Sequence, residues 1–169
     1  VVPAGWRPGG RWPVLVWLHG RDNHLTELKF LSDRSRSAGE FAPTNALVVH
    51  PYGRFCNAFK FAGERDVFEA LAHASASHGG DPARTALAGF SMGGAGAWHL
   101  GAHHAPQWRF VSPGAGFAET AEYTGILKKG PIPPSWEQTL WRWYDATVVA
   151  GNFFNTSLMA YSGEIDPQI

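Results

Sequence analysis

A serine between glycines is the residue of this chain best placed to act as a nucleophile. Residues 86–96 have the sequence Ala-Leu-Ala-Gly-Phe-Ser-Met-Gly-Gly-Ala-Gly, and the pattern G-x-S-x-G is centred on Ser91. In this pattern a sharp turn from a strand into a helix pushes the serine hydroxyl out of the sheet. The glycines leave room for a serine held in a strained backbone conformation. We therefore predict that Ser91 is a catalytic nucleophile, and an ordinary Gly-rich turn is the structural alternative.

Such a serine needs N–H donors for the oxyanion that forms when it attacks a carbonyl group. The backbone N–H of Met92 is one donor by position, because it follows the serine at the start of a helix. The second donor comes from the loop after an earlier strand, and His19, Gly20 and Arg21 stand at the end of the apolar run from Pro13. We expect the backbone N–H of Gly20 or Arg21 there. His19 would orient this loop or line the substrate pocket.

A carboxylate and a histidine complete such a site, in the chain order serine, acid, histidine. Asp166 follows the last predicted strand, and we predict that it is the acid; Glu164 and Glu119 are alternatives, as is a purely exposed loop role for Asp166. All eight histidines precede Asp166. With this order the catalytic histidine is not among residues 1–169, and we expect a further strand, a histidine loop and a closing helix beyond them. Recruitment of an earlier histidine is the other possibility.

Aromatic residues after position 135 fall on one face of a predicted helix. Trp136, Leu140, Trp143 and Tyr144 share this face. One interpretation is a helix that docks its aromatic face on the core. The other is an aromatic wall of the substrate pocket above the serine, formed by Trp136 and Trp143.

The sequence predicts neither a metal nor a cofactor. His99 and His103 lie four residues apart on a predicted helix, but no acidic residue lies between them as a metalloprotease helix requires. The Gly-rich turn lacks a dinucleotide fingerprint, and no Lys-Ser or Lys-Thr indicates a phosphate-binding loop. Cys56, the single cysteine, follows a predicted strand and so should lie near the site. No nearby pattern makes it a nucleophile, and we interpret it as a small buried residue.

Apolar runs alternate with helical patterns along the chain, which predicts a parallel sheet covered by helices on both faces. A continuous apolar run is typical of a strand buried on both sides. Residues 1–169 form one domain, and residues 117–150, rich in Gly and Pro, break the rhythm as an inserted lid or cap. The predicted strands are 13–20, 46–51, 85–90, 109–113 and 157–163, with helices at 63–77 and 93–104 and helical turns at 26–32.

Composition narrows the possible partners. The formal net charge is zero and 17% of residues are charged, which argues against a nucleic-acid partner. No apolar run is long enough to span a membrane, and no signal peptide is recognised at Val1. The oligomeric state is not predicted.

Four segments together resemble the α/β-hydrolase superfamily. More narrowly, the chain is similar to the prolyl oligopeptidase-like and the feruloyl esterase or polyhydroxybutyrate depolymerase-like hydrolases of bacteria. The segments are Pro13–Gly20, Asp81–Arg84, Gly89–Gly94 and Ser162–Asp166. The resemblance implies a three-layer α/β fold and a serine hydrolase that cleaves a small-molecule carboxylic ester through an acyl-enzyme on Ser91. It also favours an extracellular or periplasmic location. A peptidase of the prolyl oligopeptidase type and a non-catalytic binding module on the same scaffold are the alternatives.

Overall fold

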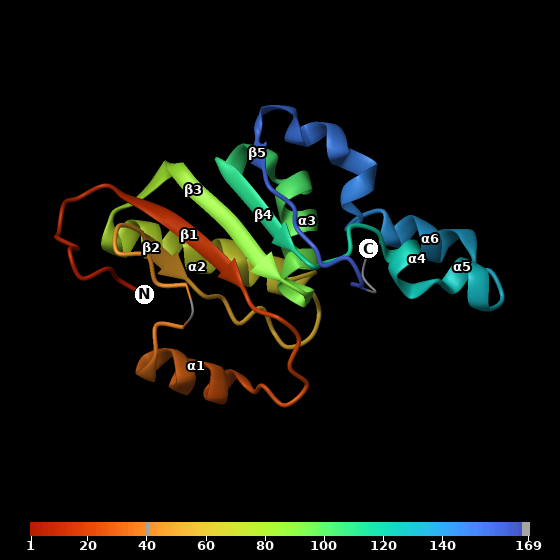
Figure 1. Cartoon of the computed structure of the whole chain (residues 1–169), viewed down its shortest axis with the longest axis horizontal. Coiled ribbons are helices and arrows are strands. Elements are labelled where there is room, and N and C mark those ends of the chain that lie inside the picture. Colours follow the sequence, from red (N-terminus) through yellow and green to blue (C-terminus); the bar gives the residue numbers. More distant parts are fainter. Residues whose placement is uncertain (40, 167–169) are drawn as a thin grey trace.

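Five parallel strands form one sheet in the order β2-β1-β3-β4-β5 (Figure 1). The structure is a computed structural model that describes residues 1–39 and 41–166. Each predicted strand is present, although β3 begins earlier than expected because Gly80 already pairs with Trp12. The bounds are β1 (Trp12–Leu18), β2 (Leu47–Val49), β3 (Gly80–Phe90), β4 (Phe110–Gly114) and β5 (Ser157–Leu158).

Two long helices pack against the sheet. Helix α2 (Ala62–His78) contacts β1, β2 and β3, and helix α3 (Met92–His103) contacts β1, β3 and β4. Both lie behind the strands in Figure 1, whereas α1 (Glu27–Arg36) lies apart, below them. The Thr26 hydroxyl accepts the Lys29 N–H at the start of α1, and this cap extends the predicted helical turns. The prediction of a parallel sheet flanked by helices is confirmed.

The core lies between the sheet and these two helices. Val14, Val16 and Leu18 of β1 are buried and belong to one apolar cluster with Val67 of α2 and Leu100 of α3. The intervening residues of β1 are only half-buried. The expectation that β1 is buried on both faces is therefore wrong, because the described helices that pack closely on β1 cover one face of it.

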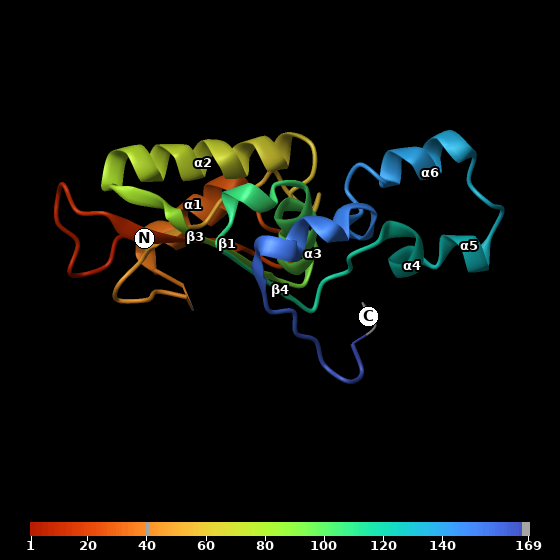
Figure 2. The ribbon, with the colours of Figure 1, turned by 90° about the horizontal axis from the view of Figure 1, so that it is seen from above.

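Short helices follow β4 and extend beyond the ends of the strands (Figures 1 and 2). Asp145 joins the two ends of this segment, because its Oδ1 accepts the Thr120 N–H at 2.9 Å and the Thr120 hydroxyl at 2.7 Å. The Ala146 N–H also donates to the Ala118 carbonyl at 2.9 Å. A lid or cap at 117–150 stays a prediction. The elements are α4 (Thr120–Thr124), α5 (Ile126–Lys129), α6 (Ser135–Trp141) and the 3₁₀ segment Ala146–Asn155.

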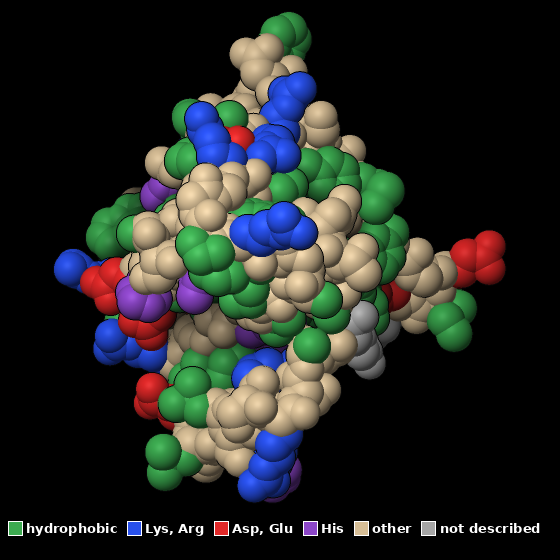
Figure 3. Space-filling model, turned by 90° about the vertical axis from the view of Figure 1, so that its left-hand side faces the viewer, with side chains coloured by type: hydrophobic (Ala, Val, Ile, Leu, Met, Phe, Trp, Pro, Cys, Tyr) green, Lys and Arg blue, Asp and Glu red, His purple; other side chains and the backbone are tan. Residues whose placement is uncertain are grey.

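An ion cluster lies where the strands begin. The buried Asp81 accepts hydrogen bonds from Arg11 Nη2 at 2.8 Å, from Arg84 Nε at 2.9 Å and from the Ala83 N–H at 3.1 Å. Figure 3 looks onto this end and shows Lys and Arg side chains spread over the face. In the part of the chain that the structure describes, no helix is long and apolar enough to cross a membrane.

Candidate active site

Ser91 occupies the tight turn between β3 and α3. Its backbone has φ 56° and ψ −118°, a conformation that L-residues rarely adopt, and its N–H donates to the Gly114 carbonyl at 2.9 Å. The glycines on either side are required by close backbone contacts. A Cβ at Gly89 would collide with the Gly93 carbonyl, and a Cβ at Gly93 would collide with the Leu18 carbonyl of β1. The residues of the G-x-S-x-G pattern thus adopt the strained turn that the pattern predicts.

Two of the predicted oxyanion donors lie beside this turn. Met92 is the first residue of α3, so its N–H is one of the first four helical N–H groups that have no intrahelical acceptor. Gly20 follows β1 and passes close to the serine, since a Cβ on it would lie 3.8 Å from Ser91 Cβ. Arg21 lines the same pocket as Ser91 and Met92. The structure therefore brings these groups together, and their roles as donors stay predictions.

The predicted acid lies on a turn at the same end of the sheet. The chain after β5 continues along β4, where Tyr161 pairs with Gly114 and accepts the Ala115 N–H at 2.8 Å. Gly114 is also the residue whose carbonyl binds the Ser91 N–H. On the turn that follows, the Ser162 hydroxyl donates to Asp166 Oδ2 at 2.8 Å. Asp166 is half-buried, whereas Glu164 on the same turn is exposed.

His19 is held by its own loop. Its Nδ1 lies 2.8 Å from the Gly20 carbonyl and its Nε2 lies 2.9 Å from the Tyr52 carbonyl, and its ring packs edge-on against Phe59. Both neighbours are carbonyl acceptors, and a neutral ring has a single N–H, so it can donate to one of them at a time. His19 lines a separate hollow with Gly20 and Phe90. Among the described residues, no histidine lines the pocket that contains Ser91.

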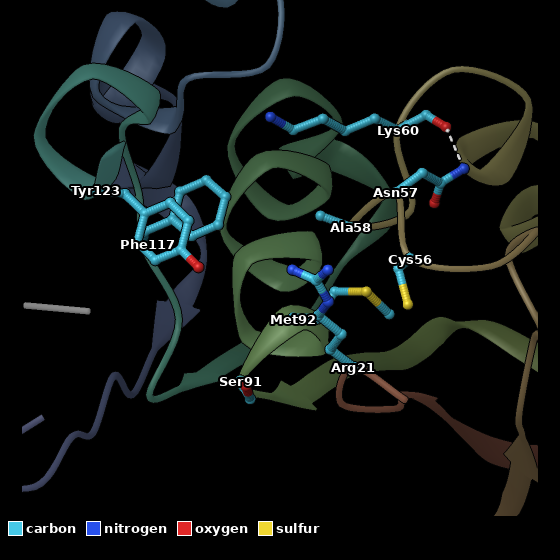
Figure 4. A pocket seen from close by; sticks show the side chains of 9 residues that line it. All are labelled: Arg21, Cys56, Asn57, Ala58, Lys60, Ser91, Met92, Phe117 and Tyr123. Carbon is cyan, nitrogen blue, oxygen red and sulfur yellow. Dashed lines mark hydrogen bonds between the residues drawn. The ribbon is translucent and has the colours of Figure 1, made fainter. Parts of the chain in front are cut away.

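The pocket beside Ser91 has a volume of about 260 Å³ (Figure 4). Its aromatic wall consists of Phe117 and Tyr123, whose rings stack with centroids 4.1 Å apart. The lining residues are Arg21, Cys56, Asn57, Ala58, Lys60, Ser91, Met92, Phe117 and Tyr123.

Trp136 and Trp143 do not line this pocket. They are 64% and 63% exposed, so their side chains do not dock on the core, and a role in substrate binding stays a prediction. Helix α6 begins after Pro134 and lies beyond the ends of the strands (Figure 1). Only Tyr144 turns back toward the core, where its hydroxyl accepts the Phe61 N–H at 3.0 Å.

The loop 53–61 supplies one side of the pocket; from the sequence we expected its Cys56 near the site but assigned no function to the loop. Residues with positive φ are concentrated in it: Arg54, Phe55, Ala58, Phe59 and Phe61. Such conformations persist only where the surroundings hold them. The loop contributes Cys56, Asn57, Ala58 and Lys60 to the lining. The expectation that Cys56 is buried is wrong, since the pocket leaves it half-exposed.

Three contacts anchor this loop. Arg54 forms two hydrogen bonds with Asp66 at 2.8 and 3.0 Å, and Phe59 is buried in the core. His99 of α3 holds the loop from below through an Nε2 contact of 2.9 Å to the Ala58 carbonyl. Burial lowers the pKa of His99 to about 4, so the ring is neutral and its Nε2–H donates to this carbonyl. In a single sequence, only Gly53 hints at an unusual backbone here.

Solved structures of known proteins share the fold of this chain. The chain resembles a thermostable esterase with a TM-score of 0.58 and 16% identity, covering 99% of this chain and 52% of that one. It resembles Mycobacterium tuberculosis MPT51 with a TM-score of 0.62 and 21% identity, covering 93% of this chain and 68% of that one. It resembles an acylaminoacyl peptidase of Pyrococcus horikoshii with a TM-score of 0.64 and 14% identity, covering 95% of this chain and 28% of that one. At these identities the likeness shows the fold.

The fold is that of the α/β-hydrolase superfamily, as predicted. Residues 1–156 match the Esterase family, and the chain belongs to that family. No curated protein matches the sequence. The chain spans about half the length of the thermostable esterase that it resembles.

Proposed function

We propose that the protein is a serine hydrolase that cleaves a carboxylic ester through an acyl-enzyme on Ser91. The observation that carries the proposal is the position of Ser91, at positive φ on a strand-to-helix turn and lining a pocket with Met92. Membership of the Esterase family favours an ester over a peptide bond. The likeness to acylaminoacyl peptidases keeps a peptidase as the second candidate.

The proposed reaction has two steps. Ser91 Oγ attacks the ester carbonyl while its proton passes to a base, and the tetrahedral oxyanion accepts hydrogen bonds from the Met92 N–H and from Gly20 or Arg21. The alcohol then leaves with the proton returned by the base. Water attacks the acyl-enzyme in the second step, and the carboxylic acid is released. Each oxyanion donor typically lowers the barrier by about 3–4 kcal/mol.

Asp166 would orient the base in this scheme. The base itself stays a prediction: a histidine that follows Asp166 in chain order. The half-buried position of Asp166 at the end of the sheet that holds Ser91 supports its role. Its bond from Ser162 would keep the carboxylate fixed.

A neutral alkyl fluorophosphonate tests the nucleophile. We expect the protein to be labelled at one site, and Ser91→Ala to abolish the labelling, which intact-mass measurement detects. Ser35→Ala is the matched control, because this serine is exposed on α1 away from the pocket, and labelling should persist. A protein that is not labelled would favour the non-catalytic binding module, and labelling that persists in Ser91→Ala would contradict Ser91 as the nucleophile.

A matched pair of substrates tests ester against peptide bond. The 4-nitrophenyl ester and the 4-nitroanilide of one acyl group differ only in the bond that is cleaved. We expect release of 4-nitrophenol and no measurable release of 4-nitroaniline. Comparable kcat/KM values for the two substrates would support the peptidase instead.

A further inference from the structure

The pocket beside Ser91 is lined by two cations and, within the described chain, by no carboxylate. Arg21 and Lys60 are the cations. Neither forms an ion pair with an acidic residue within 4.0 Å in residues 1–39 and 41–166. Of the other Lys and Arg side chains of the described chain, six form such pairs and six do not. The paired ones are Arg11, Lys29, Arg54, Arg65, Arg84 and Lys128, and the others are Arg7, Arg34, Arg36, Arg109, Lys129 and Arg142.

Lys60 is a partly desolvated ammonium between two aromatic rings. Its Nζ lies 5.5 Å from the ring centroid of Phe117 and 5.5 Å from that of Tyr144. Burial lowers the pKa of Lys60, and the charge of Asp145 offsets this only in part. Asp145 directs its Oδ1 to Thr120 instead, at 2.7 and 2.9 Å. A desolvated cation without a contacting carboxylate favours the entry of an anion.

The backbone around Lys60 is fixed before any ligand arrives. Ala58, Phe59 and Phe61 all have positive φ, and their anchors are the His99 contact, the buried Phe59 ring and the Tyr144 hydroxyl. A group held on such a loop loses little freedom when it binds a ligand. The backbone that carries Lys60 is therefore held in place, and its ammonium lies near the rings of Phe117 and Tyr144.

Lys60 and Ser91 stand at opposite ends of the pocket (Figure 4). The ammonium is thus remote from the serine hydroxyl, which makes Lys60 unsuited to act as the base. The stacked Phe117 and Tyr123 form the side of the pocket between them. A ligand that reaches from Ser91 to Lys60 therefore passes a flat apolar surface.

We propose that Lys60, assisted by Arg21, selects ester substrates that carry an anionic group, such as a carboxylate, several bonds away from the ester carbonyl. The part of the substrate between the two groups is flat and apolar and packs against Phe117 and Tyr123. The assignment rests on the proposed function, because it takes Ser91 as the reacting end. Lys60 is a specificity-determining residue in this scheme.

Binding of a ligand that cannot be hydrolysed tests the proposal. In 4-(3-oxobutyl)benzoate a ketone replaces the ester and a carboxylate lies at the far end of the ring; 4-(3-oxobutyl)benzamide is its neutral counterpart. We expect calorimetry to show that the protein binds the benzoate at least about tenfold more tightly, as is typical of charge-assisted hydrogen bonds. Equal dissociation constants for the two compounds would overturn the proposal.

Charge-matched variants assign the preference to Lys60. Lys60→Met keeps an apolar stem against the rings and should reduce the preference to within about twofold, whereas Lys60→Arg should retain it. Lys29→Met removes one charge from the exposed side of α1, where Lys29 pairs with Asp33, and should leave the preference unchanged. A preference that persists in folded Lys60→Met contradicts the assignment. If Lys60→Met does not fold, loss of the preference in folded Lys60→Arg contradicts it.

The failure of this proposal is distinguishable from that of the proposed function, because binding does not require Ser91 to react. A protein labelled at Ser91 that shows no preference for the benzoate remains a hydrolase without an anion-selective pocket. A protein that prefers the benzoate but is not labelled is not a serine hydrolase. Esters that carry the carboxylate in the acyl part or in the alcohol part then show, by their kcat/KM, which side of the substrate meets Lys60.

Discussion

The two ends of the sheet differ in whether their Arg and Lys side chains have carboxylate partners. At the end where the strands begin, Arg11 and Arg84 both bind the buried Asp81. At the end where the strands finish, Arg21 and Lys60 line a pocket without a carboxylate partner among the described residues (Figure 4). Paired charges fix a structure, whereas unpaired charges in a pocket are available to a ligand.

Backbone strain also differs between the two ends of the sheet. Among the described residues, those other than glycine with positive φ belong to the loops at the carboxyl ends of the strands: Arg54, Phe55, Ala58, Phe59, Phe61, Ser91 and Ala115. Each such residue costs about 1–3 kcal/mol and persists because its surroundings hold it. In open parallel sheets, ligands bind at the carboxyl ends of the strands. One end of this sheet therefore stabilises the fold, and the other end holds the candidate site.

The largest effect is expected at the end of the sheet that holds the candidate site, where a substitution should abolish turnover without lowering stability. We expect Asp166→Asn to lower the kcat of the full-length protein for a 4-nitrophenyl ester by about 10⁴-fold, because the base then loses its orienting carboxylate. The amide can still accept the Ser162 hydroxyl, so the urea midpoint should hardly change. The absorbance of the released 4-nitrophenol measures the rate of turnover.

Glu164→Gln is the control for this prediction, because Glu164 lies exposed on the same turn. Its kcat should stay within about twofold of the parent value. If Asp166→Asn keeps its rate within about tenfold while Glu164→Gln loses it, the acid is Glu164.

The end of the sheet that carries Ser91 is well predicted from the sequence, because local patterns specify it. Short apolar runs mark each strand, and G-x-S-x-G marks the turn at Ser91. The glycines are needed for backbone contacts within a few residues or with the neighbouring strand, so their spacing carries the information. The superfamily could be predicted with the help of these segments, and the match to the Esterase family covers residues 1–156.

The pocket walls could not be predicted in this way. Phe117 and Tyr123 meet only because the chain folds back after β4, and they have no periodic spacing. Trp136 and Trp143 do have helical spacing, but spacing does not say what a helix packs against, and both are exposed. The Lys60 site depends on contacts from residues distant in sequence, such as the aromatic ring of Tyr144.

His99 links the core to the candidate site, and its titration gives the next largest effect. Burial lowers its pKa from 6.5 to about 4 in the folded protein, so the unfolded chain binds more protons between these values. The stability that neutral His99 contributes is therefore present above pH 6.5 and is lost as the pH falls toward 4. We expect the free energy of unfolding to fall by about 2 kcal/mol between pH 7 and pH 5 on this account.

Urea unfolding of His99→Gln at the two pH values measures this contribution. Glutamine keeps an N–H donor for the Ala58 carbonyl and does not titrate, so the dependence on pH should weaken. It should not vanish, because burial also lowers the pKa of His50 to about 4. His24→Gln, at an exposed position, should keep the parent dependence. An unchanged dependence in His99→Gln would contradict the role of His99.

The smallest effect is expected at the end where the strands begin. There a substitution should lower stability without lowering the reactivity of Ser91, which is the reverse of the prediction for Asp166. Asp81→Asn removes the charge that Arg11 and Arg84 share, and the hydrogen bond from Arg84 is the main reason why the pKa of Asp81 is lowered. Because this pKa is lowered in the folded protein, the stability that the carboxylate contributes is present above 3.8 and is lost as the pH falls below it. At pH 7 the thermal midpoint of Asp81→Asn should therefore fall by a few degrees.

Fluorophosphonate labelling of Ser91 should proceed in Asp81→Asn at a rate within about twofold of the parent, because distant sites act independently. Asp33→Asn removes an exposed partner of Lys29 and should change neither the midpoint nor the rate, as is usual for surface ion pairs. If Asp81→Asn slows labelling more than about tenfold while its midpoint is unchanged, the two ends of the sheet are coupled and the division of roles between them does not hold.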